Sequence, residues 1–367
     1  MAHDNDHGAR DQGVGAHAAT VDGLVARARS EEQRGELHDA LRYYEAARLE
    51  LGEDSDPARH ADVVRWMGTA RRELGETDEA EALYRQSLDI AEKADYTAGT
   101  AHALNCLAIV TQRRGEVDRA AGIYRRAARL ATAAGEYRLC GMIEQNLGVL
   151  ANIRGDLDGA LVRYRSALDA FEAAHDREAM SWVLNNLGML HTDLGQYREA
   201  RESLRRGLRI AEERGDLGMQ GVCHLNIAES YIAERRWDDA ETPCETALKI
   251  ASQRGDALRL AGALKFRGIL DRERGHFESA ALHHDSALAL AREGRDTLLE
   301  AELLREIGTT HWRQSHAAPA RACWKRSAAL FRSIDASLDA AAVEALLLTV
   351  HDGALPGPAG VSGGPLP

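Results

Sequence analysis

Three asparagines, Asn146, Asn186 and Asn226, stand 40 residues apart in a chain of 367 residues. An asparagine amide carries two donors and a carbonyl acceptor, so a row of them can pair with both polar groups of an extended peptide backbone. Asparagine is also a mediocre helix former, and its recurrence inside helical patterns needs a reason. We therefore expect these amides to hold the main chain of a ligand. The alternative is that they are solvated or cap neighbouring helices.

Residues at neighbouring positions extend this candidate binding surface. Asn105, Gln145 and Asn185 continue the carboxamide row, and Trp182 and Met189 stand beside it either as pocket walls or as packing residues. Basic residues flank the row on both sides, which favours a ligand with acidic side chains or a free C-terminal carboxylate. The flanking residues are Arg65, Arg72, Arg113, Lys265, Arg272 and Arg305.

Residues with nucleophilic or metal-binding chemistry do not form a recognisable site. Cys244 and His284 occupy equivalent positions in successive units and could form a nucleophile–base pair, but we interpret them as core residues because no oxyanion donors are evident. His276, His283 and Asp285 are too irregularly placed for metal ligands. The sequence has no nucleotide loop, GxSxG or HExxH motif. We expect a protein that is not an enzyme and that uses no cofactor or metal.

Composition restricts the classes of partner and the compartment. The formal net charge of −12 argues against sequence-independent nucleic-acid binding, which depends on excess positive charge. The five cysteines include no CxxC pair, which favours a reducing compartment. The N-terminus lacks the apolar run of a signal peptide, and no stretch reaches the ~20 apolar residues that span a bilayer. We predict a cytoplasmic protein whose partners are neither nucleic acid nor membrane.

The elements that must position these residues repeat every 40 residues. A period held over eight copies predicts one supersecondary unit repeated, rather than a single closed core. Each unit reads as two antiparallel helices, usually with a glycine between them that accepts a left-handed C-cap. A second column of small residues faces a column of alanines, which lets the two helices pack closely. The alanines are Ala40, Ala80, Ala120, Ala160, Ala200, Ala240, Ala280 and Ala320.

The period predicts an all-α solenoid with distinct ends. Residues 1–16 are polar and read as a disordered tail, and residues 353–367 are rich in proline and glycine and read as another. A helix at 337–352 is expected to cover the apolar end of the stack, as terminal repeats require. The eight repeat units between these ends are 17–56, 57–96, 97–136, 137–176, 177–216, 217–256, 257–296 and 297–336.

These columns resemble the tetratricopeptide repeat, whose signature is W-x2-L-G-x2-Y, then A-x3-F, then P. The unit is six residues longer than usual and lacks the closing proline. In this longer form it is similar to kinesin light chains, the Pins/LGN adaptors and the bacterial Rap/PlcR-type peptide sensors. The resemblance implies a right-handed superhelix and, for Asn146, Asn186 and Asn226, a clamp on a ligand's main chain. The matching residues include Leu184, Leu187, Gly188, Ala200, Ile227, Ala228, Tyr231 and Ala240.

The resemblance implies binding of a peptide or protein but no shared chemistry. We expect a scaffold that holds an extended segment of a partner in its concave groove. The alternative is a regulatory peptide sensor or adaptor that acts on another protein through its convex surface. The sequence leaves open whether the chain also forms a homo-oligomer.

Overall fold

The structure, a computed structural model, describes residues 6–51 and 56–349, and these form seventeen α-helices and no strand. The chain divides after Asp176 into two compact units. The helices of the first unit are α1 (Asp6–Arg34), α2 (Leu37–Glu50), α3 (Pro57–Glu73), α4 (Thr77–Lys93), α5 (Thr97–Arg113), α6 (Val117–Ala133), α7 (Tyr137–Ile153) and α8 (Leu157–Ala173). Those of the second unit are α9 (Arg177–Asp193), α10 (Tyr197–Arg214), α11 (Leu217–Ala233), α12 (Trp237–Arg254), α13 (Ala257–Glu273), α14 (Phe277–Glu293), α15 (Thr297–Arg313), α16 (Ala317–Ser333) and α17 (Ser337–Thr349).

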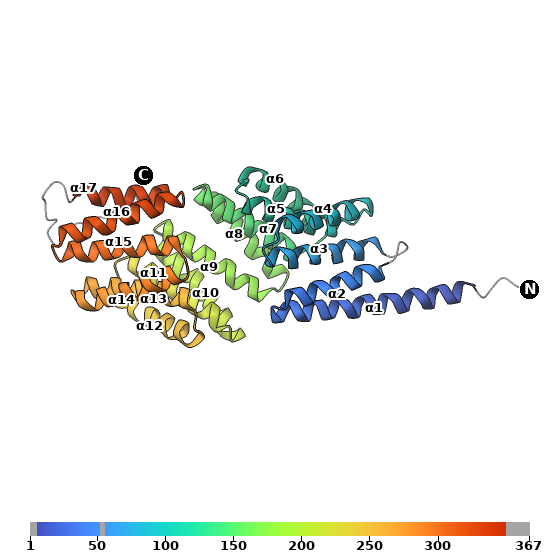
Figure 1. Ribbon diagram of the computed structural model, residues 1–367, viewed down its shortest axis with the longest axis horizontal. Coiled ribbons are helices and arrows are strands. Elements are labelled where there is room, and N and C mark those ends of the chain that lie inside the picture. The colour runs from blue at the N-terminus through green and yellow to red at the C-terminus, as the bar shows by residue number, and fades with distance from the viewer. Residues whose placement is uncertain (1–5, 52–55, 350–367) are drawn as a thin grey trace, which may run out of the picture. The chain divides into compact units, whose positions relative to one another are not determined.

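Consecutive helices pair as hairpins, α1 with α2 through α15 with α16, and the turn between them has a defined geometry (Figure 1). After α9 the backbone N–H of Gln196 donates to the carbonyl of His191 at 2.8 Å, and Gly195 lies in the left-handed region at φ 70°. This is the Schellman arrangement that ends many helices. The predicted caps are confirmed, because each of these glycines has a positive φ: Gly35, Gly75, Gly115, Gly155, Gly195 and Gly275.

The alanine column lies at the centre of each hairpin, and all eight alanines are fully buried. The facing small column meets a larger neighbour than the sequence suggested. A Cβ added to Gly188 would lie 2.4 Å from Cγ of Leu204, four residues after Ala200, and 3.2 Å from the carbonyl oxygen of Ala200. At Gly188 the absence of a side chain therefore leaves room for the bulky residue that follows the alanine by one turn, and at Gly268 that residue is His284.

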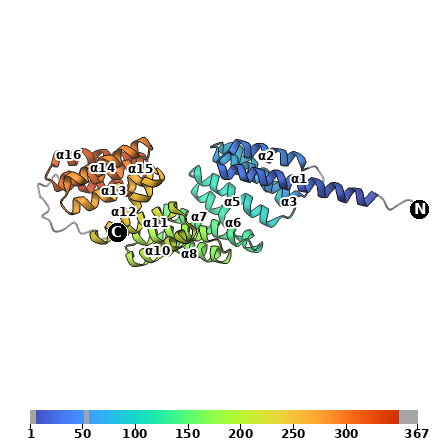
Figure 2. The same ribbon diagram turned by 90° about the horizontal axis from the view of Figure 1, so that it is seen from below.

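The hairpins of each unit stack in order, as the two views in Figures 1 and 2 show. In the second unit the first helices α9, α11, α13 and α15 contact one another in succession. Each second helix contacts its own partner and the first helix of the next hairpin, and no two second helices in the described residues are in comparable contact. The first helices thus form one layer and the second helices another. We call their solvent-facing sides the first-helix face and the second-helix face.

The ends of the stack differ in part from expectation. Helix α1 begins at Asp6, inside the segment for which we expected a disordered tail, because a helix already packed over its second half extends at the gain of one hydrogen bond per residue. At the other end α17 buries Ala340 and Val343 against α16, as a terminal cap should. Residues 1–5 and the second expected tail, 353–367, lie outside the described residues. None of the described helices combines the length and hydropathy needed to cross a membrane.

Candidate functional site

The first-helix face of α9 carries two large apolar side chains in solvent. Trp182 is 39% exposed and Met189 is 44% exposed. Asn186 lies between them at helical spacing, so all three share one side of the helix. The Asn186 side chain is half-buried and makes no hydrogen bond within the described residues. This side of α9 therefore offers an unpaired amide next to exposed apolar surface.

A second amide is held in place by a bond between neighbouring first helices. Nδ2 of Asn226 on α11 donates to Oδ1 of Asn185 on α9 at 2.7 Å. Asn185 is only 4% exposed, and its own Nδ2 points to Sδ of Met189 at 3.5 Å. Asn226 is half-buried and keeps its carbonyl oxygen unbonded. Asn185 is thus a supporting residue that orients Asn226, rather than a surface contact as expected.

Charged side chains adjoin this amide pair in the second unit. Glu229 stands one turn after Asn226 on α11, and burial raises the pKa of its carboxyl group although Lys265 and Arg305 oppose the shift. The Lys265 ammonium pairs with Glu302 at 2.6 Å. Burial also raises the pKa of Asp193, at the end of α9. Neither carboxylate was predicted from the sequence. Glu229 does carry a signal, because it stands 40 residues after Met189 and three residues after Asn226.

The basic residues expected to flank the site in the second unit are neutralised by the chain itself. Arg272 is buried and donates to Glu306 at 2.8 Å, and Arg305 lies 3.2 Å from the same carboxylate. Burial alone would raise the pKa of Glu306, but Arg272 and Arg305 lower it to about 2. This differs from the expectation of free cations for an acidic ligand, because both arginines already pair with the carboxylate of Glu306.

The first unit carries the remaining predicted residues. Gln145 and Asn146 on α7 are half-buried and form no hydrogen bond within the described residues. Asn105 on α5 differs from expectation, since it is 3% exposed and its carbonyl oxygen is buried without a partner. Arg65 and Arg72 are each paired with a neighbouring carboxylate of the same helix, at 2.8 and 2.6 Å. Arg113 is exposed and makes no ion pair in the described part of the chain.

The cysteine and histidine that could have formed a nucleophile pair are core residues. Both are fully buried, and Sγ of Cys244 points to the carbonyl of Ala263 at 3.6 Å. Burial raises the pKa of the Cys244 thiol to about 12 and lowers the pKa of His284 to about 4, which leaves both groups neutral near pH 7. No group of three or more metal-ligating side chains occurs within residues 6–51 and 56–349.

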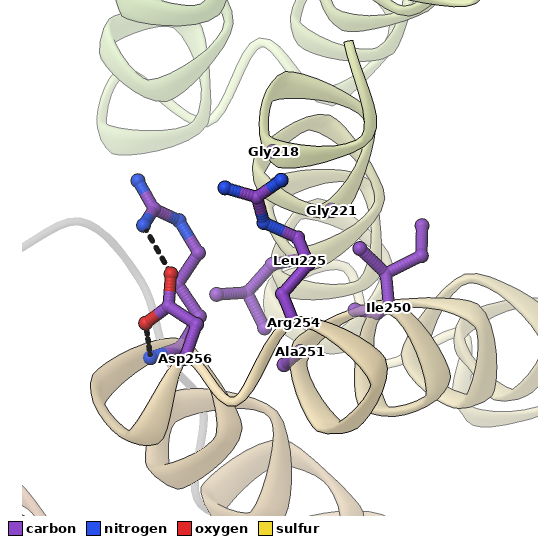
Figure 3. A pocket seen from close by; sticks show the side chains of 9 residues that line it. Gly218, Gly221, Leu225, Ile250, Ala251, Arg254 and Asp256 are labelled. Atoms are coloured by element: carbon purple, nitrogen blue, oxygen red, sulfur yellow. Dashed lines mark hydrogen bonds and ion pairs between the residues drawn. The ribbon is translucent and has the colours of Figure 1, made fainter. Parts of the chain in front are cut away.

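A small hollow lies between α11, α12 and α13 (Figure 3). The Arg254 guanidinium lies over Gly218, at the position where the preceding repeat has the carboxylate of Glu178 paired with Arg214 at 2.7 Å. Asp256 closes the other side by accepting from the backbone and side chain of Arg259. The hollow has room for about one water molecule, so we do not assign a ligand to it.

The comparisons with known proteins agree on the architecture. The tetratricopeptide repeat family matches residues 60–133 and 138–213. A search of curated proteins found no match. Solved structures do match, at low sequence identity, and at this level they establish the fold alone.

Three of these structures illustrate the match. One is a Rap protein complexed with competence and sporulation factor (16% identity, TM-score 0.55, 96% of this chain and 89% of that one). Another is the Rap conjugation gene regulator of plasmid pLS20 in complex with the Phr* peptide (17% identity, TM-score 0.53, 77% of this chain and 76% of that one). A third is a signal-transduction ATPase with a tetratricopeptide repeat sensor from Pyrococcus horikoshii (16% identity, TM-score 0.64, 76% of this chain and 44% of that one). The family match over residues 60–133 and 138–213, with the helical hairpins, the alanine column and the glycine caps, shows that the chain contains tetratricopeptide repeats.

Proposed function

We propose that the first-helix face of the second unit binds an extended peptide segment of a partner protein. Asn186 and Asn226 pair with its main chain, while Trp182 and Met189 contact its side chains. The observation that carries the proposal is the adjacency of incompletely bonded amides and two large exposed apolar side chains on one face. Apolar surface supplies binding free energy, and fixed polar groups supply orientation, which is the usual composition of a recognition site.

The matched Rap structures support the class of ligand, since one was solved with a peptide. The carboxamides support the mode of binding, because an amide that donates and accepts complements a peptide group of any sequence. Lys265, Arg272 and Arg305 already pair with carboxylates of the chain. An acidic ligand is therefore less favoured at this face than the sequence suggested. Side-chain selectivity would then come from Trp182 and Met189.

The test is a peptide selected from a random displayed library on the intact wild-type protein. Its affinity is then measured by fluorescence anisotropy for wild type and for Asn186→Ala/Asn226→Ala. Two lost hydrogen bonds of ordinary strength correspond to a loss of about tenfold or more. Gln253→Ala, an exposed carboxamide on second helix α12, serves as the control and leaves affinity unchanged. Equal affinities for wild type and the double variant, with unchanged helical circular dichroism, would show that these asparagines do not hold the ligand.

A further inference from the structure

A cluster of arginines lies on the second-helix face of the second unit, on the side of the hairpins away from the asparagines. Four arginines of α10 and Glu202 line a shallow hollow of about 380 Å³. Arg198, Glu202, Arg205 and Arg209 follow one another at intervals of three or four residues, so they occupy one side of the helix, and Arg206 borders that side next to Arg205. We call this cluster the α10 arginine face, and its arginines are Arg198, Arg205, Arg206 and Arg209.

Two of these arginines have no charge partner among the described residues, although the net charge of the protein is −12. Arg198 and Arg209 are exposed and make neither an ion pair nor a hydrogen bond in the described residues. Arg205 is also exposed, and its one hydrogen bond in the described part of the chain goes to the neutral hydroxyl of Tyr231, at 2.8 Å. The single carboxylate that lines the hollow, Glu202, does not balance these charges. The cluster is therefore a local positive patch.

The position of Arg198 is normally acidic in this chain. Its equivalent in the next hairpin is Asp238, which pairs with Arg274 at 3.2 Å, and the first unit has Asp78 and Asp118 at the same position. A carboxylate at the second residue of a helix also suits the helix dipole, which an arginine opposes. The residue equivalent to Arg274, and so the expected ion-pair partner of Arg198, is Glu234. Glu234 pairs instead with the buried Arg201 at 2.7 Å. Arg198 is thus left facing solvent against local preference, which is typical of a functional position.

The neighbouring second helices do not continue the patch. The residues equivalent to Arg205 are Glu245 on α12 and Asp285 on α14. The residues equivalent to Arg209 are Lys249 on α12 and Ala289 on α14. Lys325 and Arg326 on α16 also stand at equivalent positions, but in the described part of the second unit α10 is the only second helix with arginine at all four. In the first unit α6 has arginine at the three positions that correspond to Arg205, Arg206 and Arg209, and two of them are exposed without an ion pair: Arg125 and Arg129.

We infer that the α10 arginine face binds an acidic segment of a partner protein. Guanidinium groups pair with carboxylates through two parallel hydrogen bonds, which favours a ligand with several carboxylates. The eleven-residue interval from Arg198 to Arg209 corresponds to ~16 Å of helix, about the length of five extended residues. No aromatic side chain lines the hollow to stack on bases, and the net charge is negative, so an acidic protein segment fits better than nucleic acid.

The experiment measures binding of a fluorescent, N-acetylated hexaglutamate amide to the full chain at low salt. The test variant is Arg198→Glu/Arg209→Glu, whose exposed arginines have no ion pair or hydrogen bond to lose within the described residues. The control is Lys249→Glu/Lys325→Glu, which changes the total charge equally at exposed positions equivalent to Arg209 and Arg205 on other helices. We expect the test variant to bind at least about tenfold more weakly and the control to bind nearly as wild type.

Three outcomes would overturn the inference. They are no saturable binding by wild type, an equal loss in test and control variants, and tighter binding of a 12-nucleotide single strand than of hexaglutamate. Asn186→Ala/Asn226→Ala keeps its hexaglutamate affinity if the two faces are separate. A loss in that variant would contradict the assignment to α10.

Discussion

Replacing Gly308 by alanine tests the packing rule that a glycine on the first helix of a hairpin makes room for a bulky side chain on the second. A Cβ at this position would lie 2.5 Å from Cδ1 of Trp324, 2.6 Å from its Nε1 and 3.1 Å from the carbonyl oxygen of Ala320. The indole cannot move aside freely, because it is buried and its Nε1 donates to the carbonyl of Arg305 at 3.1 Å. Overpacking of this kind costs up to ~3 kcal/mol.

The same substitution has an intrinsic benefit that must be subtracted. Alanine is favoured over glycine inside a helix by ~1 kcal/mol. The net loss for Gly308→Ala is then about 2 kcal/mol, or about 4–8 °C in the thermal midpoint of a unit of this size. Gly262 is the matched control in the same unit, because its nearest neighbour would be a Leu225 methyl at 3.4 Å, an ordinary contact. Gly262→Ala should gain ~0.5–1 kcal/mol.

Thermal and urea unfolding followed by circular dichroism measures both variants. Opposite signs for the two substitutions support the packing rule. If both variants were stabilised, the glycine column would reflect something other than the bulk of the facing side chain.

Three other measurements examine the turns, the buried histidine and the thiols. Ser315 lies at φ 66° in a turn where most units have glycine, so Ser315→Gly should stabilise the second unit by about 1 kcal/mol in urea unfolding; no gain would mean that its left-handed backbone is unstrained. Burial lowers the pKa of His284 to about 4, so the unfolded state binds the proton more readily and stability falls as pH drops from about 6.5 to about 4. The loss between pH 7 and pH 5 is roughly 2 kcal/mol, and His284→Tyr, which restores the tyrosine of other units, should lose less over that range. The buried thiols of Cys106, Cys223 and Cys244 have raised pKa values, so an alkylating reagent at pH 8 should modify them only on unfolding and after Cys140 and Cys323, which are half-buried; equal rates would contradict the burial described.

The architecture could be predicted because it depends on residues repeated at fixed spacing. Each alanine reports a helix crossing and each turn glycine reports a left-handed cap, and both follow from local sterics. The sequence was less informative where a turn lacks glycine, since Arg235 and Ser315 adopt the same positive φ although neither residue type favours it. The start of α1 at Asp6 is not predicted either, because the polar composition of this segment is also typical of disorder.

The sequence predicts the candidate site only as sets of residues that recur every 40 positions. Asn185 and Asn186 are adjacent in sequence, yet one is buried and bonded across to α11 while the other is unbonded, and that difference depends on the partner helix. The flanking cations looked free because their partners lie 34–37 residues away, as in Arg272 with Glu306 and Lys265 with Glu302. The α10 arginines could not be predicted as a binding surface, because their freedom from ion pairs depends on which carboxylates are already paired, as Glu234 is with Arg201.

The central claim is that unbonded asparagine amides hold a ligand's main chain, and side-chain amide NMR tests it most directly. The chain has only seven asparagines, so selective ¹⁵N-asparagine labelling of the full protein gives seven pairs of side-chain signals. On titration with the selected peptide, the amide signals of Asn186 and Asn226 should shift by the largest amounts, while that of the exposed Asn152 should stay in place. A peptide that binds tightly and leaves the Asn186 and Asn226 signals unmoved would contradict the account.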